Sequence, residues 1–198
     1  MRRPVAVTLL ALVVATAIGV MVWEAGHIQR QPGHVVEGTA SDIGGPFVLT
    51  DQYGRTRHDT DYRGRYMLVY FGYTNCPDVC PSTLSVIADT LDKMEGAAQQ
   101  VVPVFITVDP ARDTPAVMQK YLSAFGPNFV GLTGSADAVT KVMKEYHVYA
   151  KQTPEKEGAY TVDHSNAIYL MGPDGKFVTS YTETIGPEKL ADALMKRM

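Results

Sequence analysis

The stretch Tyr66–Pro81, YMLVYFGYTNCPDVCP, carries the strongest structural signal in the chain. Its uninterrupted apolar run, Met67–Phe71, predicts a buried strand that ends at Gly72. After the loop that follows, apolar residues recur at the i, i+3, i+4, i+7 spacing of an amphipathic helix: Leu84, Ile87, Ala88 and Leu91. A strand therefore passes into a helix here, and the only two cysteines of the chain, Cys76 and Cys80, lie at the junction.

The two cysteines are placed for chemistry. Proline is tolerated in the first turn of a helix, so we expect the helix to begin at or just before Pro81. Cys76 then lies on the loop and Cys80 at the helix boundary, and their four-residue spacing lets both sulfurs face one point. The helix N-terminus is expected to lower the pKa of a thiol and favour the thiolate, the form that reacts or binds metal.

Strand and helix signals continue along the chain. A second continuous apolar run, Val101–Val108, predicts a strand parallel to the first with a right-handed crossover. An early strand and hairpin are expected around Phe47, Leu49 and Asp51–Gly54. A helix is expected after Asp113-Thr114-Pro115; it reaches about Phe125 and buries Val117, Tyr121, Leu122 and Phe125. A strand at Phe129–Leu132 and a helix capped by Ser135 follow.

The C-terminal half has an antiparallel pattern. The charged segment Lys151–Gly158 is expected to be mobile, and strands are expected at Tyr160–Val162 and Ala167–Met171. The turn Pro173-Asp174-Gly175 predicts a return strand at Phe177–Tyr181, and Gly186-Pro187 opens a helix with Leu190, Ala193 and Leu194 inward. A parallel βαβ half joined to an antiparallel ββα half predicts an α/β, thioredoxin-like fold with a central mixed sheet flanked by helices.

The chain begins with Met1-Arg2-Arg3 and an uncharged apolar run over residues 4–23. About twenty residues at ~1.5 Å rise span the ~30 Å core of a bilayer, so we expect a single transmembrane helix with residues 1–3 in the cytoplasm. A signal peptide cleaved at Ala15-Thr16-Ala17 is the alternative. The apolar run continues past that site to the interfacial residue Trp23, which favours an anchor. Residues 24–37 are interpreted as a tether and residues 38–198 as one domain.

Composition limits the function. The 198 residues carry a net charge of −3 and 45% apolar residues, without the clustered basic residues of nucleic-acid binders, so no nucleic-acid partner is expected. Two cysteines in an oxidising compartment suggest a disulfide. A bridge across so short a loop removes little chain entropy, so stability is a poor reason to keep the pair.

A third ligand would complete a metal site, and the chain offers five histidines. Four of them are interpreted as solvated surface groups: His27, His34, His58 and His147. We expect His164, at the start of a strand after a mobile segment, to face the cysteine loop; a structural histidine is the alternative. Two thiolates and one imidazole suit copper, whereas a structural zinc site wants four ligands. Asp78 is interpreted as a solvated carboxylate.

The segment Asp163-His164-Ser165 also separates two functions. Thioredoxin-type reductases carry a cis-proline beside their cysteines, just before the third core strand. This chain has no proline at that place. In the reductases the backbone at this proline docks the substrate, whereas a histidine at the same place supplies a metal ligand. This difference favours metal binding over thiol exchange.

Three segments together resemble the Sco/SenC family: FGYTNCPDVCP at Phe71–Pro81, Val108-Asp109-Pro110 with Arg112-Asp113-Thr114-Pro115, and Val162-Asp163-His164-Ser165. These are membrane-anchored, thioredoxin-like copper-binding proteins that help to assemble the binuclear copper site of cytochrome c oxidase. The resemblance runs from about Val36 to the C-terminus. The segment around Asp109 is also explained as a strand end followed by a helix cap.

The resemblance implies copper, as Cu(I) and/or Cu(II), held by Cys76, Cys80 and His164, and a dithiol that can cycle to a disulfide. Asp163 either orients His164 or faces solvent. No catalytic residue is expected unless Cys76 and Cys80 act as a redox-active pair.

The resemblance thus predicts a copper metallochaperone that delivers copper to, or matures, the copper-binding subunit of cytochrome c oxidase. A thiol-disulfide reductase that keeps the acceptor's cysteines reduced is the alternative, and a peroxide-consuming or redox-sensing protein is the least favoured. Periplasmic copper carriers or thiol reductants are further expected partners. With three residues before the anchor there is no room for a mitochondrial presequence, so we expect a bacterial inner membrane with residues 38–198 in the periplasm.

Overall fold

A computed structural model describes residues 43–198. The predicted transmembrane helix and tether lie outside these residues. Within the described part, no helix combines the length and apolar character needed to cross a membrane.

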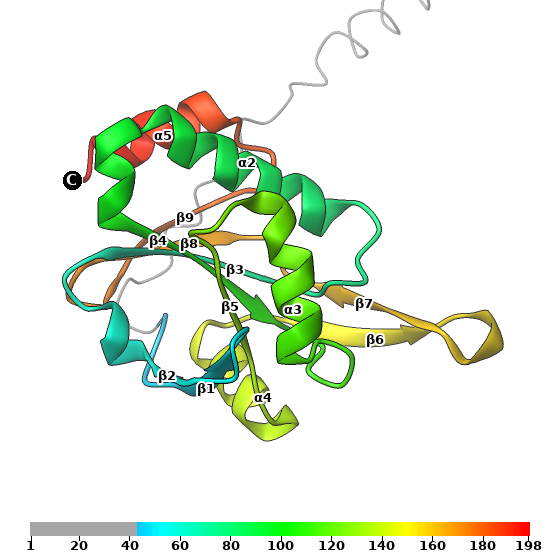
Figure 1. Ribbon diagram of the computed structural model, residues 1–198. Coiled ribbons are helices and arrows are strands. Elements are labelled where there is room, and N and C mark those ends of the chain that lie inside the picture. Colours follow the sequence, from blue (N-terminus) through cyan, green and yellow to red (C-terminus); the bar gives the residue numbers. More distant parts are fainter. Residues whose placement is uncertain (1–42) are drawn as a thin grey trace, which may run out of the picture. The chain divides into compact units, whose positions relative to one another are not determined.

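The described domain is built on a seven-stranded mixed sheet (Figure 1). Its spatial order is β2-β1-β5-β4-β3-β8-β9. Strands β5, β4 and β3 run parallel, and the other pairs are antiparallel. The bounds are Val48–Asp51 for β1, Thr56–His58 for β2, Tyr66–Gly72 for β3, Val101–Thr107 for β4, Val130–Thr133 for β5, Ile168–Met171 for β8 and Phe177–Tyr181 for β9. The predicted parallel β3–β4 pair and the early hairpin are confirmed.

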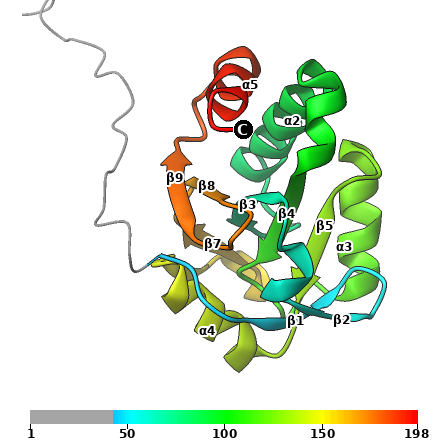
Figure 2. The ribbon, with the colours of Figure 1, turned by 90° about the vertical axis from the view of Figure 1, so that its left-hand side faces the viewer.

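Four helices flank the sheet, and short 3-10 turns join some of the elements. Helices α2, α3 and α5 lie over one face, and α4 lies against the other (Figure 2). Their bounds are Val79–Lys93 for α2, Pro115–Leu122 for α3, Ala136–Glu145 for α4 and Pro187–Met195 for α5. Thr114 and Ser135 cap α3 and α4 by accepting main-chain N–H groups of the first turn. This is the thioredoxin-like α/β fold that the sequence predicts.

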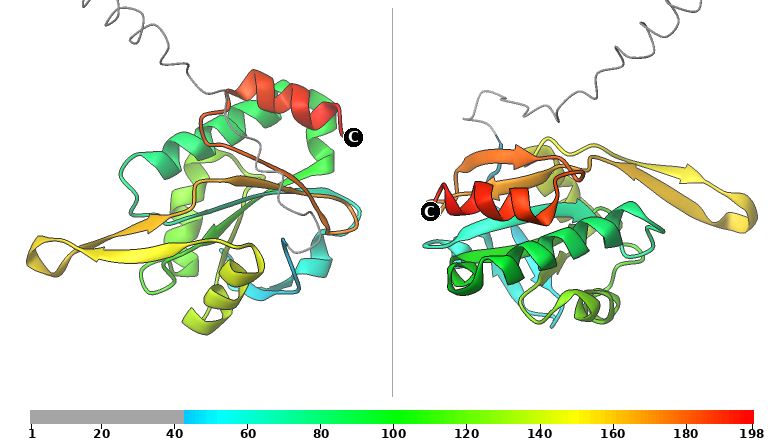
Figure 3. Two further views of the ribbon diagram at one scale, coloured as in Figure 1. Left: turned by 180° about the vertical axis from the view of Figure 1, so that it is seen from behind. Right: turned by 90° about the horizontal axis from the view of Figure 1, so that it is seen from above.

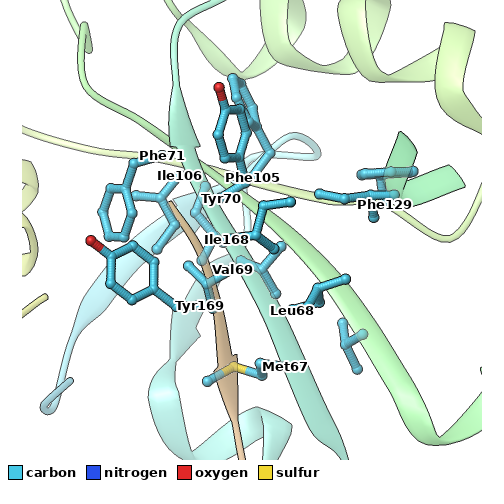
Figure 4. Close-up of a cluster of buried hydrophobic side chains, with 14 of the residues drawn as sticks. Met67, Leu68, Val69, Tyr70, Phe71, Phe105, Ile106, Phe129, Ile168 and Tyr169 are labelled. Carbon is cyan, nitrogen blue, oxygen red and sulfur yellow. The ribbon is translucent and has the colours of Figure 1, made fainter. Parts of the chain in front are cut away.

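The core lies between the helices and the central strands. All seven residues of β4 are buried, as are all residues of β3 except Tyr66, because parallel central strands are covered on both faces. Aromatic rings from separate elements meet in this core: Phe71 of β3 and Tyr169 of β8 lie 6.0 Å apart, centroid to centroid (Figure 4). Tyr146, directly after α4, lies 5.2 Å from Phe71 and 5.7 Å from Tyr169. These contacts fix α4 and β8 against β3.

The buried face of α3 differs from the prediction. Leu122 is buried as predicted, whereas Tyr121 and Phe125 are only partly buried. Val117 is 40% exposed, and Met118 is buried in its place. The reason lies in β5, where Gly131 has no side chain and lets Met118 and Leu122 lie against the strand. In α5, similarly, Ala191 is buried with Leu190 and Leu194, and Ala193 is only half-buried.

The segment Lys151–Gly158, expected to be mobile, contains regular structure that its sequence does not indicate. Strand β6, Ala150–Pro154, pairs antiparallel with β7, Tyr160–His164, in a separate two-stranded sheet. This hairpin projects away from the seven-stranded sheet (Figures 1 and 3). Residues 151–156 are exposed, so the segment has no apolar alternation to mark it as a strand. His164 is therefore the last residue of β7 and not the start of a strand.

Candidate metal centre

Three side chains that are distant in sequence converge at the end of β3. One sulfur each from Cys76 and Cys80 and a ring nitrogen of His164 lie within 4.8 Å of one another. The closest approach, from the Cys80 sulfur to Nε2 of His164, is 3.4 Å. Cys80 is buried, whereas Cys76 and His164 are partly exposed, so solvent reaches the group at Cys76 and at His164.

The start of α2 positions the two cysteines. The helix begins at Val79, which makes Cys80 its second residue and confirms that Cys76 lies on the preceding loop. The main-chain N–H of Cys80 has no partner within the helix and donates to the Cys76 sulfur at 3.4 Å. The helix end thus holds the loop sulfur above its first turn.

Gly72 makes room for the Cys80 sulfur at the end of β3. A Cβ atom at this position would lie 2.8 Å from the sulfur and 2.8 Å from the Phe105 ring. Real Cβ atoms do not approach other atoms so closely. The Cys80 sulfur can therefore occupy this position only because residue 72 is a glycine.

The acidity of Cys80 is opposite to the sequence prediction. Burial raises the pKa of the Cys80 thiol to about 12, although a main-chain N–H of Tyr73 acts in the other direction. Burial of the thiolate away from water costs more free energy here than the helix N-terminus contributes in stabilisation. Cys80 is therefore a protonated thiol at neutral pH, and its S–H faces the imidazole of His164.

His164 is held in the form that can bind a metal. Its Nδ1 lies 3.0 Å from the main-chain carbonyl oxygen of Ser165. A carbonyl can only accept a hydrogen bond, so we assign the ring proton to Nδ1, which leaves the lone pair of Nε2 directed at the Cys80 sulfur. Burial also lowers the pKa of His164 and favours the neutral ring. Asp163 is exposed, which matches the solvent-facing alternative.

Two aromatic rings enclose the imidazole. Tyr73, directly after β3, and Tyr70, within it, pack edge-on to His164 at centroid distances of 5.8 and 6.3 Å. The Tyr70 hydroxyl also lies 3.9 Å from the Cys80 sulfur. From the sequence alone, Tyr70 is only a residue of the predicted strand, and Tyr73 carries no signal that marks it as part of the site.

The donor set fits a single soft metal ion. Atoms bound to one metal at about 2.0–2.3 Å lie at most about 4.6 Å apart, close to the observed spread. Two thiolates and one imidazole favour copper. Of the other side chains considered, His58, His147 and Asp78 are exposed and lie outside this group, and His27 and His34 lie outside the described residues.

Comparison with known proteins gives one consistent family. The family model described as SCO1/SenC matches residues 36–198. A SCO2 homologue from Bos taurus, described as mitochondrial, is 43% identical over 157 residues. That match covers 78% of this chain and 59% of the bovine protein, so the chain corresponds to little more than half of that relative.

Two solved structures share both sequence and fold with the chain. ScoI of Bradyrhizobium japonicum with copper bound is 47% identical, with a TM-score of 0.75, and the match covers 79% of this chain and 99% of that one. Yeast Sco1 with copper bound is 39% identical, with a TM-score of 0.73, over 78% of this chain and 87% of the other.

Proposed function

The chain belongs to the SCO1/SenC family, and we propose that it is a copper metallochaperone. Its cargo is one copper ion, bound by Cys76, Cys80 and His164 and delivered to the copper-binding subunit of cytochrome c oxidase. The observation that carries the proposal is the convergence of two sulfurs and one imidazole nitrogen within 4.8 Å. Similarity to two Sco proteins with copper bound supports it.

The geometry suggests how these residues exchange the ion. Cys76 is partly exposed and offers the first point of contact with an incoming copper carrier. Cys80 is buried and gives up its proton when the ion binds, since thiolates are the form that ligates. The neutral ring of His164 needs to lose no proton, and the Ser165 carbonyl keeps its Nε2 turned to the sulfurs.

A titration tests the ligand set. The full chain is reduced and titrated with Cu(I) held by a chromophoric chelator, beside three variants: C76S/C80S, H164A and the control H147A, which alters an exposed histidine. We expect one ion per chain, no binding by C76S/C80S, and affinity at least about 10-fold lower in H164A, because one of three ligands is lost. H147A should match the parent. Unchanged affinity in H164A would contradict the three-ligand site.

A second candidate function is thiol-disulfide exchange on the acceptor's cysteines. Cys76 is partly exposed and its sulfur accepts the Cys80 N–H, which makes it the sulfur that an acceptor can reach. Attack on an acceptor disulfide forms a mixed disulfide, and Cys80 resolves it, leaving the acceptor reduced and a Cys76–Cys80 disulfide. This activity does not need His164, so a reductase predicts that H164A retains full exchange activity in a model-disulfide assay.

We further propose that the protein is anchored in a bacterial inner membrane with residues 38–198 in the periplasm. The apolar run 4–23 after two arginines supports this orientation. Tethering raises the local concentration of the domain at a membrane-bound acceptor. Protease added to spheroplasts should remove the domain, and the protein should resist alkaline extraction. A protein that is released at alkaline pH would contradict the anchor.

A further inference from the structure

The two halves of the metal centre belong to different sheets. Cys76 and Cys80 follow β3 of the seven-stranded sheet, whereas His164 ends β7 of the separate β6–β7 sheet. No strand pairing joins these two sheets in residues 43–198. Strand register therefore leaves the distance between the sulfurs and the imidazole unfixed, and other contacts must set it.

The loop between β4 and α3, residues 108–114, supplies contacts to β7. Arg112 donates from Nη1 to the main-chain carbonyl of Tyr160 at 2.9 Å, and its guanidinium lies 3.7 Å from the centroid of the Tyr160 ring. The Tyr160 hydroxyl donates to Asp109 at 2.9 Å, and Asp109 in turn pairs with Nε of Arg112. The first residue of β7 is thus held on both its main chain and its side chain.

The same loop also holds the segment that carries the cysteines. Asp113 is fully buried and accepts three hydrogen bonds at this point: from the Thr74 hydroxyl at 2.6 Å, from the Thr74 N–H at 3.1 Å and from the Thr107 hydroxyl at 2.6 Å. Thr74 lies two residues before Cys76. One short loop therefore contacts the cysteine segment through Asp113 and the histidine hairpin through Arg112 and Asp109.

Hydrogen bonds within the loop and to its neighbours hold its shape. The Asp109 N–H donates to the Thr107 hydroxyl at 2.8 Å, and the Asp113 N–H donates to the Asp109 carbonyl at 3.0 Å. Thr114 then caps α3 by accepting the Val117 N–H. The loop is tied at one end to β4 and at the other to α3.

We propose that Asp109, Arg112 and Asp113 form a brace that sets the position of His164 relative to Cys76 and Cys80. The proposal rests on the copper-binding function proposed above. Arg112 and Asp109 act on the histidine side of the site, through Tyr160 and also through Tyr73, whose ring centroid lies 5.6 Å from the Arg112 guanidinium and which packs on His164. Asp113 acts on the cysteine side. All three are positioning residues, and none of them is a ligand in this assignment.

The two sides of the brace make different predictions. Arg112→Met should lower Cu(I) affinity about 10–100-fold, as loss of a group that orients a metal ligand does. In an H164A background the same substitution should not lower the Cu(I) affinity any further, because the ligand that Arg112 positions is already absent. Asp113→Asn should lower the affinity in both backgrounds, since it acts through the cysteines.

The measurement is a Cu(I) competition titration on the full chain with a chromophoric chelator. Arg55→Met is the matched control, because Arg55 is an exposed arginine that also stacks on a tyrosine, Tyr53, away from the site. Tyr160→Phe is a milder second variant that removes only the hydroxyl bond to Asp109, and its effect should also vanish with H164A.

A copper-free readout separates positioning from general damage. In the metal-free protein, Arg112→Met should speed amide hydrogen exchange at Val162, whose N–H bonds the Tyr73 hydroxyl, and leave the core strand β4 unchanged. If Arg112→Met lowered the Cu(I) affinity equally in the parent and H164A backgrounds, or left it unchanged in the parent background, the brace alone would be overturned. Parent-like affinity in H164A would overturn the ligand assignment and the brace together.

Discussion

At the scale of single residues, Gly72 shows how closely the site is fitted to the sheet. We predict that Gly72→Ala destabilises the domain by about 1–3 kcal/mol, because the new methyl group would overlap both the Cys80 sulfur and the Phe105 ring. It should also weaken copper binding by displacing that sulfur. Urea unfolding and the Cu(I) titration measure the two effects.

Gly96→Ala is the matched control for this test, since a Cβ at Gly96 meets no atom within 4 Å. A Gly72→Ala variant as stable as Gly96→Ala would mean that the sulfur lies elsewhere.

Asp51 is a second residue whose role depends on its surroundings. Its buried carboxylate accepts the N–H groups of Tyr53 and Arg55 at 2.9 Å and Nε of Arg57 at 2.8 Å. Burial raises the pKa of Asp51, but these hydrogen bonds together outweigh burial and lower it below 3.8. The folded state therefore binds this proton less tightly than the unfolded state, and the resulting stability is present above about pH 4 and is lost as the pH falls below it.

We predict that Asp51→Asn costs about 1–3 kcal/mol at pH 7, because an amide nitrogen cannot accept the bonds it replaces. The loss should shrink as the pH falls from 5 to 3. Denaturant unfolding across this range tests the sign, with the exposed Asp89→Asn as control. A loss that grows on acidification would contradict the lowered pKa.

At the scale of elements, the helix caps behave as the sequence indicates. Ser135 accepts the Ala138 N–H at 3.2 Å at the start of α4, the helix whose last turn leads into the buried Tyr146. We predict that Ser135→Ala costs about 1 kcal/mol in urea unfolding. Ser85→Ala, an exposed change in the middle of α2, should cost less. Equal effects would show that the cap contributes nothing specific.

The β6–β7 hairpin shows the limit of sequence patterns at this scale. Periodicity finds strands that bury one face or both, as in β3, β4 and β8. In β6 only Ala150 is partly buried, and Lys151 and Gln152 are exposed although they pair with β7. Backbone pairing formed this strand without an apolar signal, which is why the segment was predicted to be mobile.

At the scale of the whole molecule, copper should act as a link between two parts of the domain. The Cys80–His164 contact spans 84 positions of sequence and joins two sheets. A ligand that binds only the folded state stabilises it by about 2.7 kcal/mol at a free concentration 100 times its Kd. For a domain of this size, each kcal/mol shifts the Tm by about 2–4 °C.

We therefore predict that buffered Cu(I) at this excess raises the Tm of the full chain by about 5–10 °C. The shift should disappear in C76S/C80S and decrease in H164A. Circular dichroism during heating measures it. A shift of equal size in C76S/C80S would mean that copper stabilises the protein from a different site.

Local sequence signals are enough to predict much of the fold and two of the three candidate ligands. Apolar periodicity placed the parallel strands and most of the helices, and the Cys76–Cys80 spacing at a strand–helix junction marked the site, because these signals are local. The place of His164 just before the third core strand singled it out among the five histidines, and the resemblance to Sco/SenC proteins implied that it is a ligand. The ligand roles of these three residues and the membrane anchor stay predictions.

The remaining features depend on how distant segments pack in the folded domain. His164 lies at the end of a paired strand, and the Ser165 carbonyl sets its tautomer. Burial raises the pKa of Cys80, whereas the helix end alone predicts a lower pKa. Asp113 accepts a hydrogen bond from Thr74 in the cysteine loop, a contact that its interpretation as part of a helix cap does not predict. Each of these depends on burial and on contacts between segments far apart in the chain, which no local pattern records.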